Sequence, residues 1–318
     1  MMIVVIIPCY KVKNKILSVI DKIGPEVDRV IVVDDACPEN SGDYVKEHCR
    51  QSRVSVLSHK VNKGVGGAVI TGYKEAIKLN ADVVVKIDGD GQLDPRLLTN
   101  FVRPIISGES DFVKGNRFYS WEMISSMPRV RFFGNSALSF ISKLVSGYWT
   151  IMDPTNGYTA ISGAVLQKMP LDKLDNRYFF ETDMLFRLGT VRAKVIDIPM
   201  MAVYADEKSS LSSLQAALTF PPKFFIRLVK RIVYNYFLRD FNLGSAYIIS
   251  GIFLIGFGLS FGIWHWVHSV QLASSSGTVM LAALPIILGY QSLVQFITYD
   301  VLMEPKTPIH QYLKIYQS

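Results

Sequence analysis

Short apolar runs alternate with longer amphipathic stretches through the first ninety residues of this chain. Runs rich in Val and Ile predict buried strands, and the stretches between them, with apolar residues at helical spacing, predict helices. The expected strands cover 3–7, 30–33, 54–57 and 83–87, and the expected helices cover 14–23, 42–49 and 66–79. Strands and helices in this alternating order form an α/β domain with a largely parallel sheet.

Proline, tyrosine or aspartate residues directly follow three of these strands. They are Pro8 and Tyr10, then Asp34 and Asp35, then Asp88 and Asp90. Ligands of open parallel sheets bind at the carboxyl ends of the strands. A chance turn explains one aspartate cluster but not three strand ends that deliver such residues to one edge, so the pattern favours a binding site.

The segment Lys86–Gln92 carries two carboxylates, Asp88 and Asp90, one residue apart. At a strand end both would point to the same side, and the intervening Gly89 lets the backbone turn. Hard oxygen ligands suit Mg²⁺ or Mn²⁺, with substrate phosphate and water completing the shell, so a metal here could clamp the diphosphate of a sugar nucleotide. Taken alone, this segment is equally compatible with an ordinary turn.

A glycine-rich segment, Asn62–Ala68, lies between the third strand and its helix and includes Lys63 and Gly64. Free N–H groups at a helix N-terminus favour an anionic ligand. The segment lacks the Gly-Lys-Ser/Thr ending of a P-loop, and a dinucleotide fingerprint would follow the first strand. A tight loop without a ligand is the alternative interpretation.

Two long apolar segments, Leu243–Val267 and Val279–Met303, dominate the last third of the chain. Each can cross a hydrocarbon core of about 30 Å. The loop between them contains no Lys or Arg, whereas basic residues flank the pair, so the positive-inside rule places both ends in the cytoplasm. We expect a multi-pass protein of the inner (plasma) membrane, and the Gly258 and Gly262 pair on the first span can pack within one chain or in a homo-oligomer.

The stretch before the first span, 216–241, has apolar residues at helical spacing interleaved with Lys and Arg, which predicts an amphipathic helix at the membrane interface. A basic DNA-binding helix would not lead into two spans, so nucleic acid is not an expected partner. The expected parts are a cytosolic catalytic domain at 1–215, the interfacial helix at 216–241, a two-span hairpin at 242–304 and a cytosolic tail at 305–318.

Composition agrees with a membrane protein that handles anions. Of the 318 residues 49% are hydrophobic, the net charge is +7 and the mean hydropathy is +0.24. The three cysteines form no CxxC pair, which predicts a reducing compartment and no zinc site. The N-terminus runs straight into an apolar strand without a basic region or cleavage site, so no signal peptide is expected.

Six short motifs together resemble the family 2 glycosyltransferases of the GT-A fold, and more closely the dolichol-phosphate-mannose synthases and bacterial polyisoprenyl-phosphate glycosyltransferases. The motifs are Ile7-Pro8-Cys9-Tyr10, Val32-Val33-Asp34-Asp35, Asn62-Lys63-Gly64, Asp88-Gly89-Asp90-Gly91-Gln92, Gly115-Asn116-Arg117 and Asp153-Pro154-Thr155-Asn156-Gly157-Tyr158. The resemblance implies that Asp88, Asp90 and Gln92 surround the metal. It also implies that Pro8, Tyr10 and Asp35 line the nucleoside pocket, although Lys11-Val12 replaces the usual Asn-Glu.

A basic segment follows the fifth motif and carries the residues expected at an acceptor phosphate: Asn116, Arg117, Arg129, Arg131 and Asn135. Arginine binds phosphate bidentately. Aromatic residues lie next to these basic residues in the sequence, which favours an apolar cleft near a membrane over a solvated basic face. By resemblance Arg117, Arg131 and Asn135 grip the phosphate of a polyprenyl acceptor, and Lys208 belongs to a loop that closes on the donor diphosphate.

Asp183, in the first turn of an expected helix, is either a general base or a positioning residue, since acids there also stabilise the helix dipole. The expected activity is an inverting, metal-dependent transfer of a sugar from a UDP- or GDP-linked donor to undecaprenyl or dolichyl phosphate. One alternative is transfer to a hydroxyl of a polyprenyl-diphosphate-linked sugar in O-antigen or other surface-glycan assembly, with Asp183 as base. A membrane scaffold that has lost activity is the non-enzymatic alternative.

Overall fold

The computed structural model describes residues 1–120, 129–201, 213–268 and 275–315. The chain divides into two compact units, one formed by Met1–Leu228 with Pro305–Ser318 and the other by Val229–Glu304. Each unit has its own apolar core, so each is described separately.

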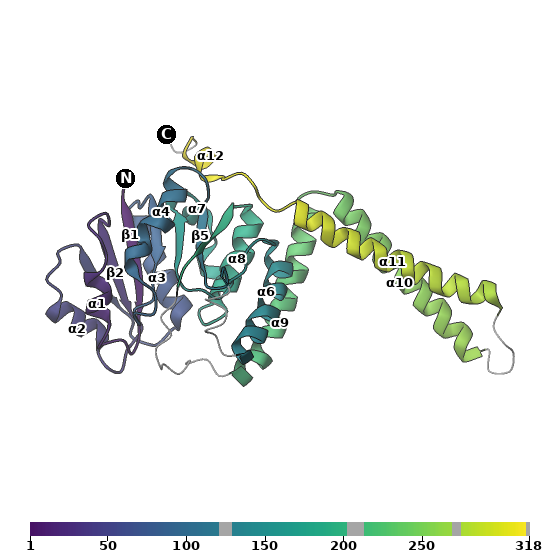
Figure 1. Cartoon of the computed structure of the whole chain (residues 1–318), viewed down its shortest axis with the longest axis horizontal. Helices are drawn as coiled ribbons and strands as arrows, with labels where there is room; N and C mark the ends of the chain where they lie inside the picture. The colour runs from purple at the N-terminus through teal and green to yellow at the C-terminus, as the bar shows by residue number, and fades with distance from the viewer. Residues whose placement is uncertain (121–128, 202–212, 269–274, 316–318) are drawn as a thin grey trace. The chain divides into compact units, whose positions relative to one another are not determined.

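The first unit is built on a seven-stranded sheet in the order β3-β2-β1-β4-β6-β5-β7. Figure 1 shows this sheet with helices packed around it. The strands are β1 (Ile3–Cys9), β2 (Arg29–Asp34), β3 (Val54–Ser58), β4 (Val83–Lys86), β5 (Phe112–Asn116), β6 (Thr159–Ser162) and β7 (Val195–Pro199). Only β6 runs antiparallel to its neighbours β4 and β5 among the described pairs. The prediction of a mostly parallel α/β sheet is therefore confirmed.

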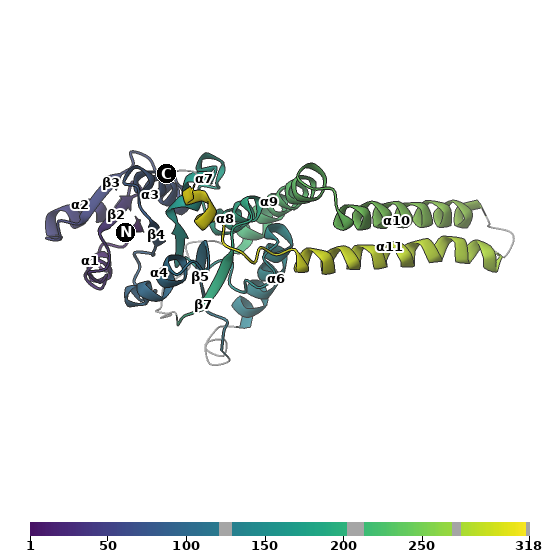
Figure 2. The same ribbon diagram turned by 90° about the horizontal axis from the view of Figure 1, so that it is seen from above.

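Helices cover both faces of this sheet (Figure 2). They are α1 (Ile16–Asp21), α2 (Ser41–His48), α3 (Val65–Lys78), α4 (Leu98–Ile106) with the short 3₁₀ turn Pro95–Leu97 before it, α7 (Gly163–Lys168), α8 (Phe180–Val191) after the 3₁₀ turn Leu171–Lys173, and α12 (His310–Ile315). A further helix, α6 (Arg129–Ser146), packs against α8. The first three helices match the predicted ranges to within a few residues.

Alternation along the strands explains why two layers of helices are needed. Val4 and Ile6 of β1 join the core beneath α3, α7 and α8, whereas Val5 and Ile7 join the core beneath α1 and α4. Successive side chains of a strand point to opposite faces, and here both sets are apolar and fully buried. The sheet is thus enclosed, and its exposed chemistry is confined to the strand ends.

The C-terminal segment returns to the first unit and packs on it. Asp111, fully buried between α4 and β5, accepts hydrogen bonds from the backbone N–H groups of Ile309 and His310 at 2.8–3.0 Å. The His310 Nδ1 atom lies 2.7 Å from the same carboxylate. The expected tail at 305–318 is therefore integrated into the α/β unit as far as it is described.

The second unit is a helical hairpin of α10 (Leu243–His268) and α11 (Ser276–Leu302), preceded by the end of α9 (Ser213–Val233) and a π-helical turn, Tyr234–Leu238. Both hairpin helices are long and apolar enough to cross a membrane, and few residues of their most apolar windows are buried, 17% and 6%. Exposure of so much apolar surface is unfavourable in water. The two predicted spans are confirmed as helices of that length and composition.

Close backbone approach holds the hairpin together. A side chain at Gly289 would meet the Gly251 carbonyl oxygen at 2.9 Å, and one at Gly258 would meet the Ala282 carbonyl at 2.7 Å. The Gly258 end of the small-residue pair therefore packs within one chain. At the base of the unit, Arg231 forms a bidentate ion pair with Asp300 at 2.8 and 2.9 Å, and both side chains are buried.

Candidate active site

The predicted metal loop follows β4, where Asp88, Asp90 and Gln92 are half-buried. The loop is held locally, because Asp90 Oδ1 accepts a hydrogen bond from the Gln92 backbone N–H at 3.0 Å and Gly91 adopts a positive φ of 73°. Asp88 Oδ1 lies 2.9 Å from Lys86 Nζ. The two carboxylates therefore stay at the sheet edge, as the sequence predicts.

Lys86 is a residue that the sequence reasoning passed over. Its side chain is 1% exposed and its ammonium contacts two acids, since Glu181 Oε1 lies 3.2 Å away and Asp88 Oδ1 lies 2.9 Å away. Burial lowers the pKa of Lys86, but the charges of Asp88 and Glu181 outweigh it and the pKa lies above its ordinary value. A lysine at the end of an unbroken Val83–Val85 run was the available signal.

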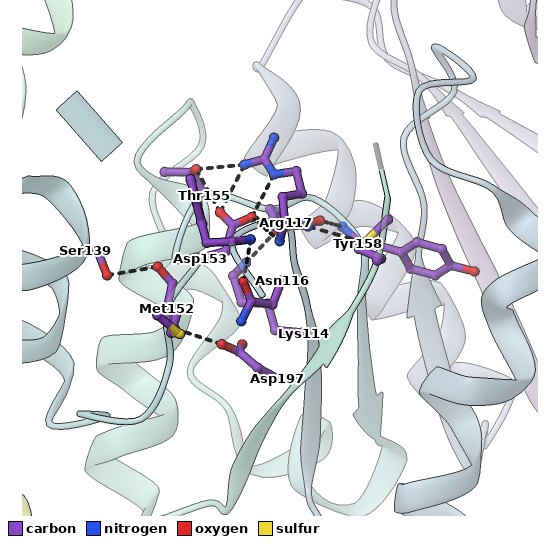
Figure 3. Close-up of polar contacts among 12 residues, drawn as sticks. Lys114, Asn116, Arg117, Ser139, Met152, Asp153, Thr155, Tyr158 and Asp197 are labelled. Carbon is purple, nitrogen blue, oxygen red and sulfur yellow. Dashed lines mark hydrogen bonds and ion pairs between the residues drawn. The ribbon is translucent and has the colours of Figure 1, made fainter. Parts of the chain in front are cut away.

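The segment 153–158 forms a second loop at the same edge, and Arg117 clasps it (Figure 3). The Arg117 guanidinium donates from Nε to Asp153 Oδ2 at 2.7 Å and from Nη2 to Asp153 Oδ1 at 3.0 Å. Nη2 also donates to Thr155 Oγ1 at 3.2 Å. Asp153 is fully buried, so this bidentate pair fixes how the loop sits beside the end of β5.

Beneath that loop lies a buried polar layer, also seen in Figure 3. The Lys114 ammonium, 1% exposed, donates to the Asn156 carbonyl oxygen at 2.5 Å, and burial lowers the pKa of Lys114 to about 8. Asp197 accepts from the Met152 N–H at 2.7 Å, and burial raises the pKa of this carboxyl to about 7. Asn116 is buried too, and its amide oxygen accepts from the Phe118 N–H. In this arrangement Asn116 shapes the turn that carries Arg117.

The two loops meet at Gly157. A Cβ added there would lie 1.9 Å from Asp88 Oδ2 and 2.8 Å from Lys86 Nζ. Only a residue without a side chain permits this approach. The predicted metal loop and the loop clasped by Arg117 are thus neighbours in the fold.

On the nucleoside side, Pro8 is half-buried and Tyr10 is 43% exposed beyond the end of β1. Asp35 is only 3% exposed, and its carboxylate accepts from the backbone N–H groups of Lys63 at 2.8 Å and Gly64 at 2.7 Å. His59 Nδ1 lies 2.7 Å from the same carboxylate. Asp35 therefore anchors the glycine-rich loop, and a direct role in nucleoside binding stays a prediction.

Tight packing accounts for the glycines of that loop. The N-cap of α3, Gly64, has a φ of 89°, and a Cβ at Gly66 would lie 2.3 Å from the Asp175 carbonyl oxygen. The Gly67 N–H at the first turn of α3 donates to the Asn176 carbonyl at 2.9 Å. This contact supports the tight-loop interpretation, while the Lys63 side chain itself is exposed.

The described contacts of Asp183 are with α8, α9 and the segment before α8. Its carboxylate is fully buried and pairs with Arg227 of α9 at 2.8 Å and with Arg187 at 3.4 Å. It also accepts from the Asp175 N–H at 2.9 Å. These contacts support the positioning role of Asp183, because they join α8 to α9. Glu181, two residues earlier, is the acid of this turn that faces Lys86 and Asp88 through its ion pair.

The structure describes several of the predicted acceptor-site and donor-site residues only in part or not at all. Lys208 lies outside the described residues, and for Arg129, Arg131 and Asn135 the structure describes the backbone of α6 but not the side chains. Helical spacing puts positions 131 and 135 on one face of α6. Their proposed contacts with a phosphate stay predictions.

The donor set at the metal loop fits a hard divalent cation. Two half-buried carboxylates one residue apart and the Gln92 amide supply oxygen ligands. No cluster of three or more His, Cys, Asp or Glu occurs in the part of the chain that the structure describes. Such a loop suits Mg²⁺ or Mn²⁺ that draws its remaining ligands from a substrate diphosphate and water, and not a fully protein-ligated metal.

Comparison with known proteins places this site in context. The model of the family Glycosyl transferase family 2 matches residues 4–169. The UDP-N-acetylglucosamine–dolichyl-phosphate N-acetylglucosaminyltransferase of Methanococcus voltae is 30% identical over 219 residues, which cover 64% of this chain and 87% of that protein. The undecaprenyl-phosphate mannosyltransferase of Micrococcus luteus is 30% identical over 211 residues, covering 64% and 84%.

Solved structures share the fold. Glucosyl-3-phosphoglycerate synthase from Mycobacterium tuberculosis, in complex with Mn²⁺, uridine diphosphate and glucosyl-3-phosphoglycerate, superposes with a TM-score of 0.52 at 22% identity. The match covers 72% of this chain and 79% of that one. The same enzyme with Mg²⁺ and uridine diphosphate gives 0.52 at 20% identity. These likenesses confirm a GT-A fold for the sheet described above.

Proposed function

Because this chain belongs to glycosyl transferase family 2, we propose that it transfers a sugar from a nucleotide-sugar donor to a polyprenyl phosphate, with inversion at the anomeric carbon. The names of the relatives from Methanococcus voltae and Micrococcus luteus support this acceptor class. The observation that carries the proposal is the meeting of two loops at Gly157, because it brings the Asp88 carboxylate beside the loop that Arg117 clasps.

The donor site uses the predicted metal loop. Asp88, Asp90 and Gln92 would hold Mg²⁺ or Mn²⁺, which when bound supplies positive charge for the departing nucleoside diphosphate. Pro8 and Tyr10 line the nucleoside side, with Asp35 holding Lys63 and Gly64 in place. Lys208 belongs to the segment expected to close over the diphosphate.

The acceptor site uses the basic segment. Arg117 would orient the polyprenyl phosphate, together with Arg131, Asn135 and Arg129 on α6. A phosphate is already anionic and attacks without a general base, so charge balance and alignment supply most of the rate. An arriving phosphate would share the Arg117 guanidinium with Asp153, which keeps the arginine pre-oriented.

One observation favours a second candidate, transfer to a hydroxyl of a polyprenyl-diphosphate-linked sugar. That reaction needs a base, and Glu181, 14% exposed, is joined to Asp88 through Lys86. Asp183 is less suited because its carboxylate is fully buried between two arginines. Glu181→Gln separates the two candidates, since a hydroxyl acceptor would lose about 100-fold or more in kcat and a phosphate acceptor would lose little.

We further propose that the hairpin of α10 and α11 anchors the enzyme in the membrane with the catalytic unit and both ends in the cytoplasm. Within α9, Phe224 and Leu228 pack inward against the aromatic cluster around Phe179. Phe225 and Val229 instead point outward and are 67% and 42% exposed, which gives an apolar stripe suited to the interface. One apolar side of α9 thus packs against the cluster around Phe179, and the other is the side proposed to lie at the membrane interface.

The test is to incubate the purified membrane protein with undecaprenyl phosphate, Mn²⁺ or Mg²⁺ and a panel of labelled sugar nucleotides, then to count label in the lipid phase. Labelled monophosphoryl lipid from one donor, lost in Asp88→Asn, is the expected result. An Asp88→Asn protein that keeps wild-type activity would refute the metal assignment. Metal-dependent donor binding without a lipid product would refute the polyprenyl-phosphate acceptor and favour the second candidate.

A further inference from the structure

Two buried lysines occupy matching places on either side of β6. Lys86 of β4 and Lys114 of β5 are each in register with Thr159 of β6, one from each side. Both side chains are 1% exposed. An ammonium removed from water is costly unless a partner compensates it, so the partner shows what each lysine holds in place.

Their partners differ in kind. Lys86 Nζ lies 2.9 Å from Asp88 Oδ1 and 3.2 Å from Glu181 Oε1, so it joins the metal loop to α8. Lys114 Nζ donates to a backbone carbonyl, that of Asn156, at 2.5 Å. Equal burial with unequal partners makes Lys114 a matched control for Lys86.

We infer that Lys86 is a positioning residue that fixes the carboxylate of Asp88 for metal binding and couples it to Glu181. The inference rests on the metal site of the proposed function. With Oδ1 tied to the buried Lys86 and Oδ2 against Gly157, the Asp88 carboxylate cannot rotate without breaking its ion pair with that lysine or entering the neighbouring loop. Glu181 gives the Lys86 ammonium a second carboxylate partner on α8.

The direction in which Mn²⁺ affinity changes when Lys86 is replaced distinguishes an orienting role from simple charge repulsion. A lysine next to a cation site repels the cation, so removing its charge should strengthen metal binding if charge alone mattered. Groups that orient metal ligands act in the opposite sense, and their loss weakens binding about 10–100-fold. Lys86→Met therefore gives opposite predictions under the two accounts.

The experiment measures Mn²⁺ affinity of the full-length protein in detergent with saturating UDP, from the electron paramagnetic resonance signal of free Mn²⁺. We expect Lys86→Met to weaken binding about tenfold or more and Lys114→Met, which reaches the metal loop only through the backbone of Asn156, to weaken it clearly less. Unchanged or tighter binding in Lys86→Met, or an equal loss in Lys114→Met, overturns the inference. If wild type binds no Mn²⁺, or Asp88→Asn binds it normally, the metal site itself fails and the inference falls with it.

A second variant guards against misfolding, because Lys86→Met leaves Asp88 and Glu181 without their shared cation. The double variant Lys86→Met/Glu181→Gln removes one of these carboxylates and should show the same tenfold loss. Glu181→Gln alone keeps the contact between Lys86 and Asp88 and should stay within about threefold of wild type. A double variant that folds and binds Mn²⁺ like wild type overturns the inference.

Discussion

Replacing Gly157 by alanine should disable the metal loop while leaving the protein folded. A Cβ at this position would lie 1.9 Å from Asp88 Oδ2, whereas real Cβ atoms essentially never approach closer than 3.0 Å. The φ of Gly157 is not positive, so alanine adds no backbone strain. The new methyl group must therefore displace the carboxylate that it meets.

The size of this displacement sets the expected effect. Asp88 Oδ2 is the end of a flexible side chain and must retreat by about 1.1 Å or more, which is far beyond the roughly 0.2 Å tolerated in a metal–ligand distance. The Lys86 ammonium, 2.8 Å from the added Cβ, limits the directions of escape. We expect Mn²⁺ affinity with UDP present to fall by about 10–100-fold, as for other losses of ligand orientation.

Mn²⁺ titration followed by electron paramagnetic resonance measures the affinity, and a thermal melt of the same sample reports folding. Gly134→Ala is the control, since no atom among the described residues lies within 4 Å of a Cβ at that position. Wild-type Mn²⁺ affinity in a folded Gly157→Ala protein would refute the coupling between the two loops. A protein that melts far below wild type would show that the loop, and not the carboxylate, yields to the methyl group.

Three further outcomes follow from buried groups. Asp183→Asn should destabilise the protein by about 3 kcal/mol in urea unfolding, because the fully buried carboxylate loses its pairing with Arg227, and a stable but inactive variant would instead support a base role. Burial raises the pKa of Asp197 from 3.8 to about 7, so the folded state holds a proton that the unfolded chain has released. Stability should therefore fall as pH rises from about 4 to 7, and Asp197→Asn should flatten that part of the thermal-unfolding profile; an unchanged slope would contradict it. Gly289→Leu should lower the melting temperature of the protein in detergent, since its Cβ would meet backbone of the facing helix at 2.9 Å, while Gly256→Leu, whose Cβ has no atom of the described residues within 4 Å, should not.

Local pattern was enough to predict the secondary structure of the first ninety residues and the two long apolar helices. Val- and Ile-rich runs fit strands buried on both faces, and β1 to β4 begin and end within a few residues of the predicted ranges. Apolar length alone predicts the hairpin helices. These features depend on neighbours along the chain, which a sequence displays directly.

Some features of the candidate site could likewise be predicted from the sequence, and others could not. The sequence predicts that Asp88 and Asp90 follow a strand that ends at one edge of the sheet, and the structure has them there. Arg117 was expected from its family motif, and the structure adds that it follows β5. The sequence could not show that the Arg117 guanidinium pairs with Asp153, which lies 36 positions away. It also could not show that Asp183 pairs with Arg227, 44 positions away. Helix periodicity gives the face of a residue but not the partner that packs against it.

By itself, then, the sequence determined the strands and helices of the first ninety residues, the family motifs and the two apolar spans, because these follow from residue type and short-range spacing. Only the tertiary structure decided that Lys86 joins Asp88 to Glu181 across 95 positions of chain, and that Asp111 receives the C-terminal segment. A buried charge is stable only with a partner, and that partner is chosen by how the elements pack in three dimensions.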